Sequence, residues 1–193
     1  MFVNYRRKKN GFTLLEMLVA IGVFSVVATV AVSSVLMSLR ANRKIRSTQT
    51  VINNLGYALE SMTRAIRVGT HYHCDVNVGP ITARRDCSSA ASSFAFESSG
   101  GDRGDPNDQV VYRLNGTTIE RSLDGGASYS PFTAAEVVVE RLQFFVEHAA
   151  ALPDQNQPFV IMTIEGYAAP DPATRTDFHI QTTVTQRIRD QIP

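Results

Sequence analysis

The chain of 193 residues lacks a strong excess of charge and lacks the common catalytic motifs. Its formal net charge is +1 at pH 7, and 44% of its residues are hydrophobic. A nucleic-acid-binding protein needs a marked positive excess or a basic face, and the totals indicate neither. The sequence contains no Gly-x-Ser-x-Gly, no His-Glu-x-x-His and no phosphate-binding loop. We therefore expect a globular protein that is not an enzyme, has no cofactor and has no nucleic-acid partner.

Proline is absent between Phe12 and Val68, and charge is almost absent from the first part of that stretch. Between Phe12 and Leu39, a span of 28 residues, the only charged side chain is Glu16. A helix needs roughly 20 apolar residues to cross a bilayer core, so this segment is long enough. It is too long for an ordinary cleaved secretory signal.

Basic residues lie on both sides of the apolar segment, four before it at 6–9 and four after it between 40 and 46. Counting these basic residues therefore does not decide the membrane orientation by the positive-inside rule. A short basic start followed by an apolar run nevertheless favours an N-in orientation, with the rest of the chain outside the cytoplasm.

The carboxylate of Glu16 is the anomaly in this segment. An acid at the centre of a bilayer costs about 2.5–3.5 kcal/mol on insertion scales, and such residues are usually functional. A position near the membrane interface would lower the cost, and this simpler explanation stays open.

The residues around Glu16 follow an order that resembles a known N-terminal signal. The stretch "GFTLLEMLVAI", which runs from Gly11 to Ile21 after a basic start, resembles the class III signal of type IV prepilins and type II secretion pseudopilins. The resemblance implies that prepilin peptidase cleaves between Gly11 and Phe12 and methylates the new amino group of Phe12. It also implies that Glu16 pairs with that amine on a neighbouring subunit during assembly.

The resemblance and the hydrophobic pattern together predict four regions. They are a cytoplasmic leader at 1–11, a transmembrane or filament-core helix at 12–39, an amphipathic helix at 40–68 and a globular β-rich head at 69–193. In the second helical region, apolar residues recur at spacings of three and four, as in an amphipathic helix. These residues are Ile52, Leu55, Leu59, Met62 and Ile66.

The head contains several strand patterns. Asn115-Gly116 lies between two alternating segments and predicts a β-hairpin. Further strands are expected in "EVVVERLQFFVE", "FVIMTIEGY" and "FHIQTTVTQRI". In the second of these segments, one face of the strand carries Val160, Met162 and Ile164. In the third, one face carries Phe178, Ile180, Thr182 and Val184. An antiparallel sheet with one apolar face needs a cover, and the helix stripe supplies one. The predicted fold class is α+β and pilin-like.

Only two cysteines occur, Cys74 and Cys87. If the head lies outside the cytoplasm, we expect a disulfide between them. A metal site is an alternative because His71 and His73 stand beside Cys74, although the spacing matches no standard zinc finger. Free thiols are the third alternative.

An acidic loop follows a segment of small polar residues. Asp102, Asp105, Asn107 and Asp108 offer oxygen atoms that suit calcium, but the EF-hand pattern is not met. A solvated turn is the default interpretation, and calcium is a weak candidate. The preceding range 88–101 is expected to be a mobile loop.

These features favour a minor pilin or a minor pseudopilin, and the order of elements resembles the J-type minor pseudopilins. Such a protein would span the inner membrane once and then enter a filament. Its expected partners are prepilin peptidase, other pilins or pseudopilins and an assembly platform. The alternatives are a filament-tip binding module, for adhesion, DNA uptake or contact with a secreted substrate, and a plain single-pass anchored protein.

Overall fold

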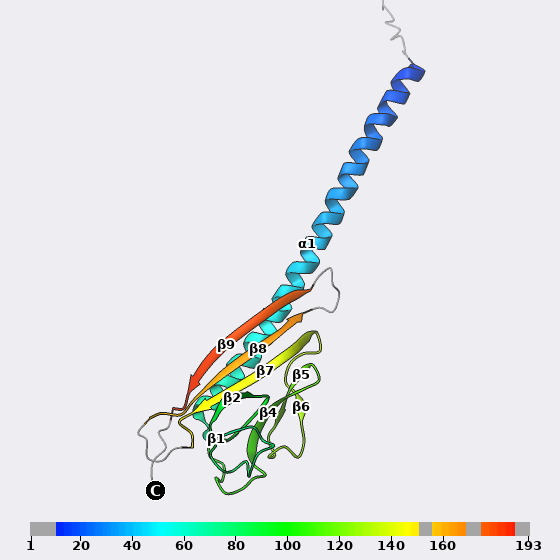
Figure 1. The fold of residues 1–193 in the computed structure, drawn as a ribbon. Coiled ribbons are helices and arrows are strands. Elements are labelled where there is room, and N and C mark those ends of the chain that lie inside the picture. Colours follow the sequence, from blue (N-terminus) through cyan, green and yellow to red (C-terminus); the bar gives the residue numbers. More distant parts are fainter. Residues whose placement is uncertain (1–10, 151–155, 169–174, 188–193) are drawn as a thin grey trace, which may run out of the picture. The chain divides into compact units, whose positions relative to one another are not determined.

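The computed structural model describes residues 11–150, 156–168 and 175–187. These residues form one helix and nine strands (Figure 1). The chain divides into two compact units, Met1–Arg43 and Lys44–Pro193, and the strands all belong to the second. The α+β class and the long apolar N-terminal helix of the predicted pilin-like fold are confirmed.

Helix α1 spans Leu14–Val68, 55 residues without a break. The sequence predicted a start at Phe12, and the helix begins two residues later because Thr13 acts as its N-terminal cap. At the other end, the amide of Gly69 donates to the Ala65 carbonyl at 3.0 Å. A side chain at Gly69 would stand 2.3 Å from the Phe96 ring, so this position tolerates only glycine.

The rear part of α1 lies against the head through one apolar face. Leu55, Met62 and Ile66 are each at most 1% exposed, and Leu59 is partly buried against the same core. Ile52 was predicted on this stripe, but it is 64% exposed. The buried part of the stripe therefore begins one helical turn later than the pattern indicated.

The strands form two antiparallel sheets, where one sheet was expected. The first sheet has the order β1-β3-β4-β5-β6. Its strands are β1 (Thr70–Cys74), β3 (Ser93–Glu97), β4 (Gln109–Asn115), β5 (Thr118–Ser122) and β6 (Ser130–Pro131). The second has the order β2-β7-β8-β9. Its strands are β2 (Cys87–Ala91), β7 (Val137–Glu147), β8 (Phe159–Ala168) and β9 (Thr176–Thr185).

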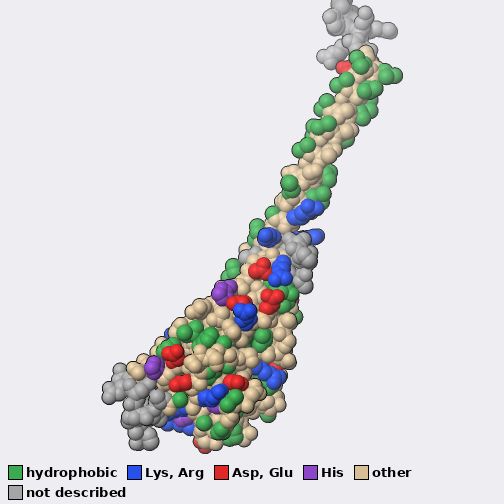
Figure 2. All heavy atoms as spheres, in the orientation of Figure 1, with side chains coloured by type: hydrophobic (Ala, Val, Ile, Leu, Met, Phe, Trp, Pro, Cys, Tyr) green, Lys and Arg blue, Asp and Glu red, His purple; other side chains and the backbone are tan. Residues whose placement is uncertain are grey.

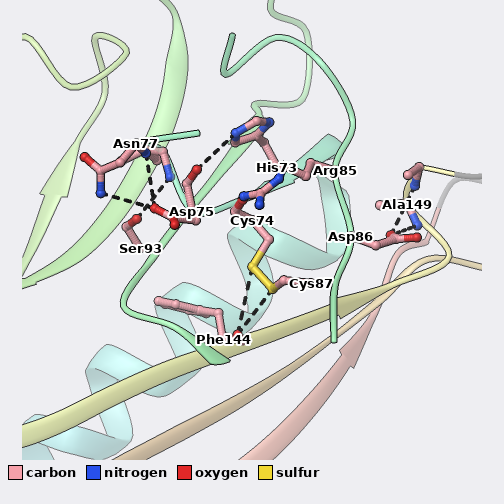
Figure 3. Close-up of a disulfide and its surroundings, with 12 residues drawn as sticks. His73, Cys74, Asp75, Asn77, Arg85, Asp86, Cys87, Ser93, Phe144 and Ala149 are labelled. Carbon is pink, nitrogen blue, oxygen red and sulfur yellow. Dashed lines mark hydrogen bonds between the residues drawn. A yellow bond between two sulfur atoms is a disulfide. The ribbon is translucent and has the colours of Figure 1, made fainter. Parts of the chain in front are cut away.

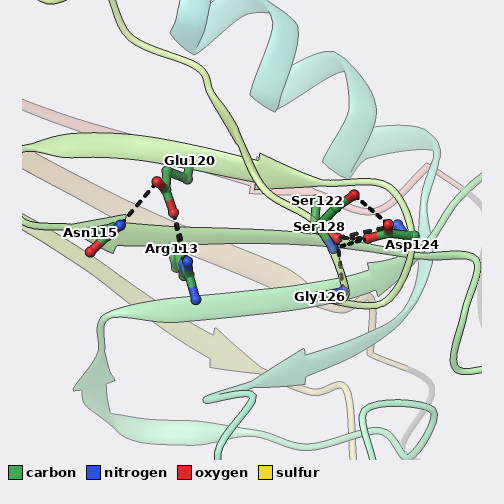
Figure 4. Close-up of polar contacts among 7 residues, drawn as sticks. All are labelled: Arg113, Asn115, Glu120, Ser122, Asp124, Gly126 and Ser128. Carbon is green, nitrogen blue, oxygen red and sulfur yellow. Dashed lines mark hydrogen bonds and ion pairs between the residues drawn. The ribbon is translucent and has the colours of Figure 1, made fainter.

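The hairpin predicted at Asn115-Gly116 joins β4 to β5. Asn115 pairs with Thr118, and Gly116 has a φ of 58°, a value that glycine adopts without strain. Beside the turn, Arg113 Nε and Asn115 Nδ2 donate to the two oxygens of Glu120 at 2.9 and 3.0 Å (Figure 4). These hydrogen bonds, first from Asn115 and then from Arg113, lower the pKa of Glu120.

The period-2 patterns of the second sheet are confirmed. Val160, Met162 and Ile164 are fully buried on β8. On β9 the residues at even positions from Phe178 to Val184 are less exposed than their neighbours. The face that the sequence marked as apolar is the face that packs into the core.

The expectation of a mobile loop at 88–101 is wrong. This range contains most of β2 and all of β3, and every residue of β3 is buried. The Phe94 ring stacks on Phe96 of the same strand and on Phe144 of β7, with centroids 5.6 and 5.4 Å apart. Burial of the two phenylalanine rings joins the two sheets. This burial orders the segment in spite of the small polar residues around the rings.

Candidate processing and assembly segment

The start of α1 is held by a reciprocal pair of hydrogen bonds. The amide of Glu16 donates to the Thr13 hydroxyl at 3.2 Å, and the amide of Thr13 donates to Glu16 Oε2 at 3.4 Å. This arrangement is a capping box, in which two otherwise unpaired helix-start amides are satisfied. Its signature, Thr-x-x-Glu before an apolar run, is present in the sequence, although our sequence reasoning missed it.

The capping box gives Glu16 a local partner next to the predicted cleavage site. Gly11 and Phe12 precede the helix, and Phe12 is 78% exposed. The carboxylate is also favoured by the helix dipole, since it stands in the first turn. The predicted basic start at 6–9 lies outside the described residues.

The apolar surface of the helix in the first unit is not covered by any other part of the chain that the structure describes. The helical span Leu14–Arg46 contains an 18-residue window with a mean hydropathy of 2.4, of which 0% is buried, so the span is long and apolar enough to cross a membrane. Figure 2 shows hydrophobic side chains along this part of the helix. A single apolar N-terminal helix of this kind fits single-pass anchoring.

Three hydroxyl side chains within the apolar span donate to carbonyls of the helix itself. The hydroxyls of Ser25, Thr29 and Ser33 each donate to the carbonyl four residues earlier, at 2.8, 2.8 and 2.9 Å. Groups satisfied inside the segment need no water, so these residues are compatible with hydrocarbon.

The two cysteines form the expected disulfide. The Cα atoms of Cys74 and Cys87 are 5.8 Å apart, and the bond joins β1 of one sheet to β2 of the other. Both sulfurs lie close to the Phe144 carbonyl oxygen, at 3.9 and 3.5 Å (Figure 3). With both thiols in a disulfide, the alternatives of a cysteine metal ligand and of free thiols are overturned.

The neighbouring histidine has a structural role. His73 is 1% exposed, and its Nδ1 lies 2.6 Å from the Ala83 carbonyl oxygen. It thereby fixes the loop between the two cysteines. Within the described ranges, no three His, Cys, Asp or Glu side chains are grouped so that they could hold a metal ion.

The acidic loop uses much of its oxygen to shape its own backbone. Asp102 Oδ1 accepts from the Gly104 amide at 3.0 Å, and Asp105 Oδ1 accepts from the amide and side chain of Asn107. Asp108 Oδ2 accepts from the Asp102 amide at 2.7 Å. These contacts describe a turn, and the calcium prediction for this set remains a prediction.

The helix is capped at its start, and its front part is exposed and apolar. It continues into a β-rich head that contains a disulfide. These features are those of proteins anchored by an N-terminal helix. Within this class, the family model described as "prokaryotic N-terminal methylation motif" matches residues 6–38. This match supports the resemblance of the N-terminal segment to type IV prepilins. No curated protein and no solved structure matches the chain.

Proposed function

We propose that this chain is a minor pilin or minor pseudopilin, a structural subunit of a type IV pilus or a type II secretion pseudopilus. The observation that carries the proposal is the capped and uncovered apolar helix, which begins within three residues of a Gly-Phe junction inside the matched motif. The order of strands after the helix supports a J-type minor subunit.

The proposed processing follows from the motif. Prepilin peptidase cleaves between Gly11 and Phe12 and methylates the amino group of Phe12, so that 1–11 is removed as a leader. Range 12–39 then forms the transmembrane and filament-core helix, 40–68 the amphipathic helix and 69–193 the head. Cleavage on the cytoplasmic side leaves the helix in the inner membrane with the head outside the cytoplasm.

In the proposed assembly step, Glu16 exchanges its local partner for one on another chain. Before cleavage, the Phe12 nitrogen is a neutral amide, and the carboxylate accepts a hydrogen bond from the Thr13 amide. Cleavage creates a cationic amine, and methylation keeps its charge. Pairing with that amine on a neighbouring subunit offsets the cost of burying the acid, and selects the correct register.

Substitutions at Glu16 test this step. Glu16→Gln keeps the capping box but removes the charge, whereas Thr13→Ala removes the cap and keeps the charge. We expect Glu16→Gln and Glu16→Val to be cleaved normally, but their recovery in sheared filaments or cross-linked envelope multimers should fall roughly 100-fold, because a lone buried amine is left.

Thr13→Ala is the matched control and should be incorporated nearly as well as the wild type. N-terminal mass measurement verifies that each variant is processed. Normal incorporation of Glu16→Gln, or an equally large loss for Thr13→Ala, would show that the carboxylate acts only as a cap.

A further inference from the structure

Strand β9 forms one edge of the second sheet (Figure 1). It pairs with β8 along all ten residues from Thr176 to Thr185, and the pairing has no register shift. The strand contains neither proline nor lysine. A long, regular edge of this kind is a template for another strand, and native proteins usually protect such edges with bulges, proline, lysine or short strands.

The other three sheet edges carry protections of this kind. Strands β1 and β2 have five residues each, and the pairing of each contains a register shift. Strand β6 has two residues, one of which is Pro131. Among the sheet edges that the structure describes, β9 alone is long, regular and without these protections.

The hydrogen bond that follows β9 shows which of its backbone groups point outward. The register places Gln186 opposite Pro158, and the Gln186 amide donates to the Pro158 carbonyl at 2.9 Å. Hydrogen-bonded and non-hydrogen-bonded pairs alternate along an antiparallel ladder. The even-numbered residues of β9 therefore bond to β8. The odd-numbered residues from Asp177 to Thr185 direct their N–H and C=O groups away from it.

The outward edge ends where the chain meets α1. Arg187 is the next residue in the odd-numbered series, and its amide donates to the Arg67 carbonyl at 2.7 Å. This bond agrees with the outward direction of the series. Before Arg187, the outward backbone groups of β9 have no hydrogen-bond partner in the backbone that the structure describes. The edge is therefore open along the strand and closed by the helix at its end.

The side chains at this edge have room for a neighbour. Phe178 and Ile180 point toward the core but are only partly buried, whereas Met162 and Ile164 on β8 are fully buried. The odd-numbered side chains on the other face are exposed. An added strand would cover Phe178 and Ile180 if it carried apolar residues on the core side and polar residues on the outer side.

A basic hollow lies at the closed end of the edge. It has a volume of about 400 Å³ and is lined by Glu60, Thr63, Arg64, Arg67, Val68 and Arg187. The Arg64 side chain pairs with Glu60 at 2.6 Å. Arg67 and Arg187 are exposed, and neither forms an ion pair with a residue in the described ranges. Two uncommitted guanidinium groups favour a carboxylate at this end.

We propose that the open edge of β9 binds an extended segment of a partner protein as an additional antiparallel strand. The main chain of the segment would satisfy the outward groups, and its alternating side chains would provide specificity. Because β9 runs toward the hollow, an antiparallel segment places its N-terminal end there. The recognised segment therefore carries a carboxylate near its N-terminal end, followed by apolar residues at alternate positions. This binding does not depend on processing at Gly11.

The probe is a peptide with blocked ends that copies 176–185, TDFHIQTTVT, because this sequence has the required acid and alternation. It is titrated into the full chain in detergent, and amide hydrogen exchange is resolved by residue. Without peptide, the odd-numbered amides of β9 should exchange at least about tenfold faster than the even-numbered ones. At saturation, the exchange of the odd-numbered amides should slow at least about tenfold.

Substitutions at Thr183 test the edge itself. Thr183→Pro removes an outward donor and leaves the bonds to β8, and proline is tolerated at such edge positions. Thr183→Lys adds a charge that disfavours edge pairing. Each variant should bind the peptide at least about tenfold more weakly than the wild type. A melting temperature within roughly 3 °C of the wild type verifies the fold, and the lysine variant serves if the proline variant does not fold.

A second set of variants tests the arginines. A peptide with Asp177→Asn should bind the wild-type chain roughly tenfold more weakly than the unchanged peptide does. On a chain with both Arg67→Gln and Arg187→Gln, the two peptides should bind equally. Arg141→Gln is the matched control, because Arg141 pairs with Glu165 and does not line the hollow. It should distinguish the two peptides as the wild type does.

The proposal is overturned if the wild type does not bind the peptide, or if peptide binding protects amides elsewhere and not the odd-numbered ones of β9. Wild-type affinity in both Thr183 variants would also overturn it. Odd-numbered amides that are protected without peptide, and lose this protection on dilution, would show that a second copy of the chain fills the edge instead of a different partner.

Discussion

Glu16 is bonded to the Thr13 amide at the start of a helix whose next 23 residues carry no other charge. A carboxylate in that place stabilises the helix start through the capping box and the helix dipole. In the proposed processing, the same carboxylate becomes available to a stronger partner once a cationic amine exists at Phe12. At the scale of single residues, we propose that the local cap and the intermolecular pair are successive states of one side chain.

Asp124 offers a second residue-scale test, in the turn after β5. Its carboxylate accepts from the hydroxyls of Ser122 and Ser128 and from the Ser128 amide (Figure 4). These bonds, with Ser122 first, lower its pKa from 3.8 to about 2. A lowered folded-state pKa contributes stability above the unfolded value, and this contribution is lost as the pH falls toward about 2.

We therefore expect Asp124→Asn to lower the melting temperature at pH 6 and to have little effect at pH 2. Thermal unfolding at both pH values measures the difference. Glu136→Gln, at an exposed position, is the control and should behave like the wild type. A deficit of the same size at both pH values would mean that the turn depends on shape and not on the charge of Asp124.

At the scale of elements, the rear half of α1 is coupled to the sheets by buried side chains. Met62 is fully buried, whereas Ile52 on the same predicted stripe is 64% exposed. Met62→Ala should lower the free energy of unfolding by about 2–5 kcal/mol, because it leaves a cavity. Ile52→Ala should change it by no more than about 0.5 kcal/mol. Urea unfolding measures both, and equal losses would contradict the observed limit of the buried stripe.

The elements that the sequence predicted are those with long and regular patterns. Helix α1, the Asn115-Gly116 hairpin and the alternating strands β7, β8 and β9 each carry a signal within their own residues. Strands β1, β2 and β3 were not predicted, because each has only five residues and small or polar residues interrupt its apolar pattern. They are held by pairing with strands distant in the chain, and pairing of this kind has no local signature.

Side-chain contacts could likewise be predicted from the sequence only where both partners lie close together in the chain. The capping box could have been read from Thr13 and Glu16 alone, since its signature is local. The hydrogen bond from Gln109 Nε2 to Glu97 Oε2 joins residues that meet only through the register of β3 on β4. No rule of sequence spacing brings these two residues together, so the sequence did not predict this contact.

At the scale of the whole molecule, the disulfide connects the two sheets of the head. The two cysteines are separated by 13 positions in the sequence, so the bond closes the connection between β1 and β2. Replacing both cysteines by serine should lower the free energy of unfolding by about 2–4 kcal/mol, through loss of the constraint on the unfolded chain. Denaturant unfolding of the full chain, with and without reductant, measures this. The reductant should destabilise the wild type and leave the double variant unchanged.

An unchanged denaturation midpoint in the double variant would contradict this role. In that case the aromatic contacts between Phe94 and Phe144 would suffice to join the sheets.

The two units of the chain serve one function in the proposed filament subunit. The matched motif covers 6–38, and the helix that begins at Leu14 is long enough to cross a membrane and extends to Val68. In the proposed function, processing creates the charged N terminus on which assembly depends, so every later step requires it.

The most direct test is the mass of the N-terminal peptide from protein extracted from its native membrane. The account predicts a chain that begins at Phe12 with a methylated amino group, and predicts that a bulky residue in place of Gly11 leaves the leader attached. A wild-type chain that still begins at Met1, or a Gly11 variant that is still cut before Phe12, would contradict it.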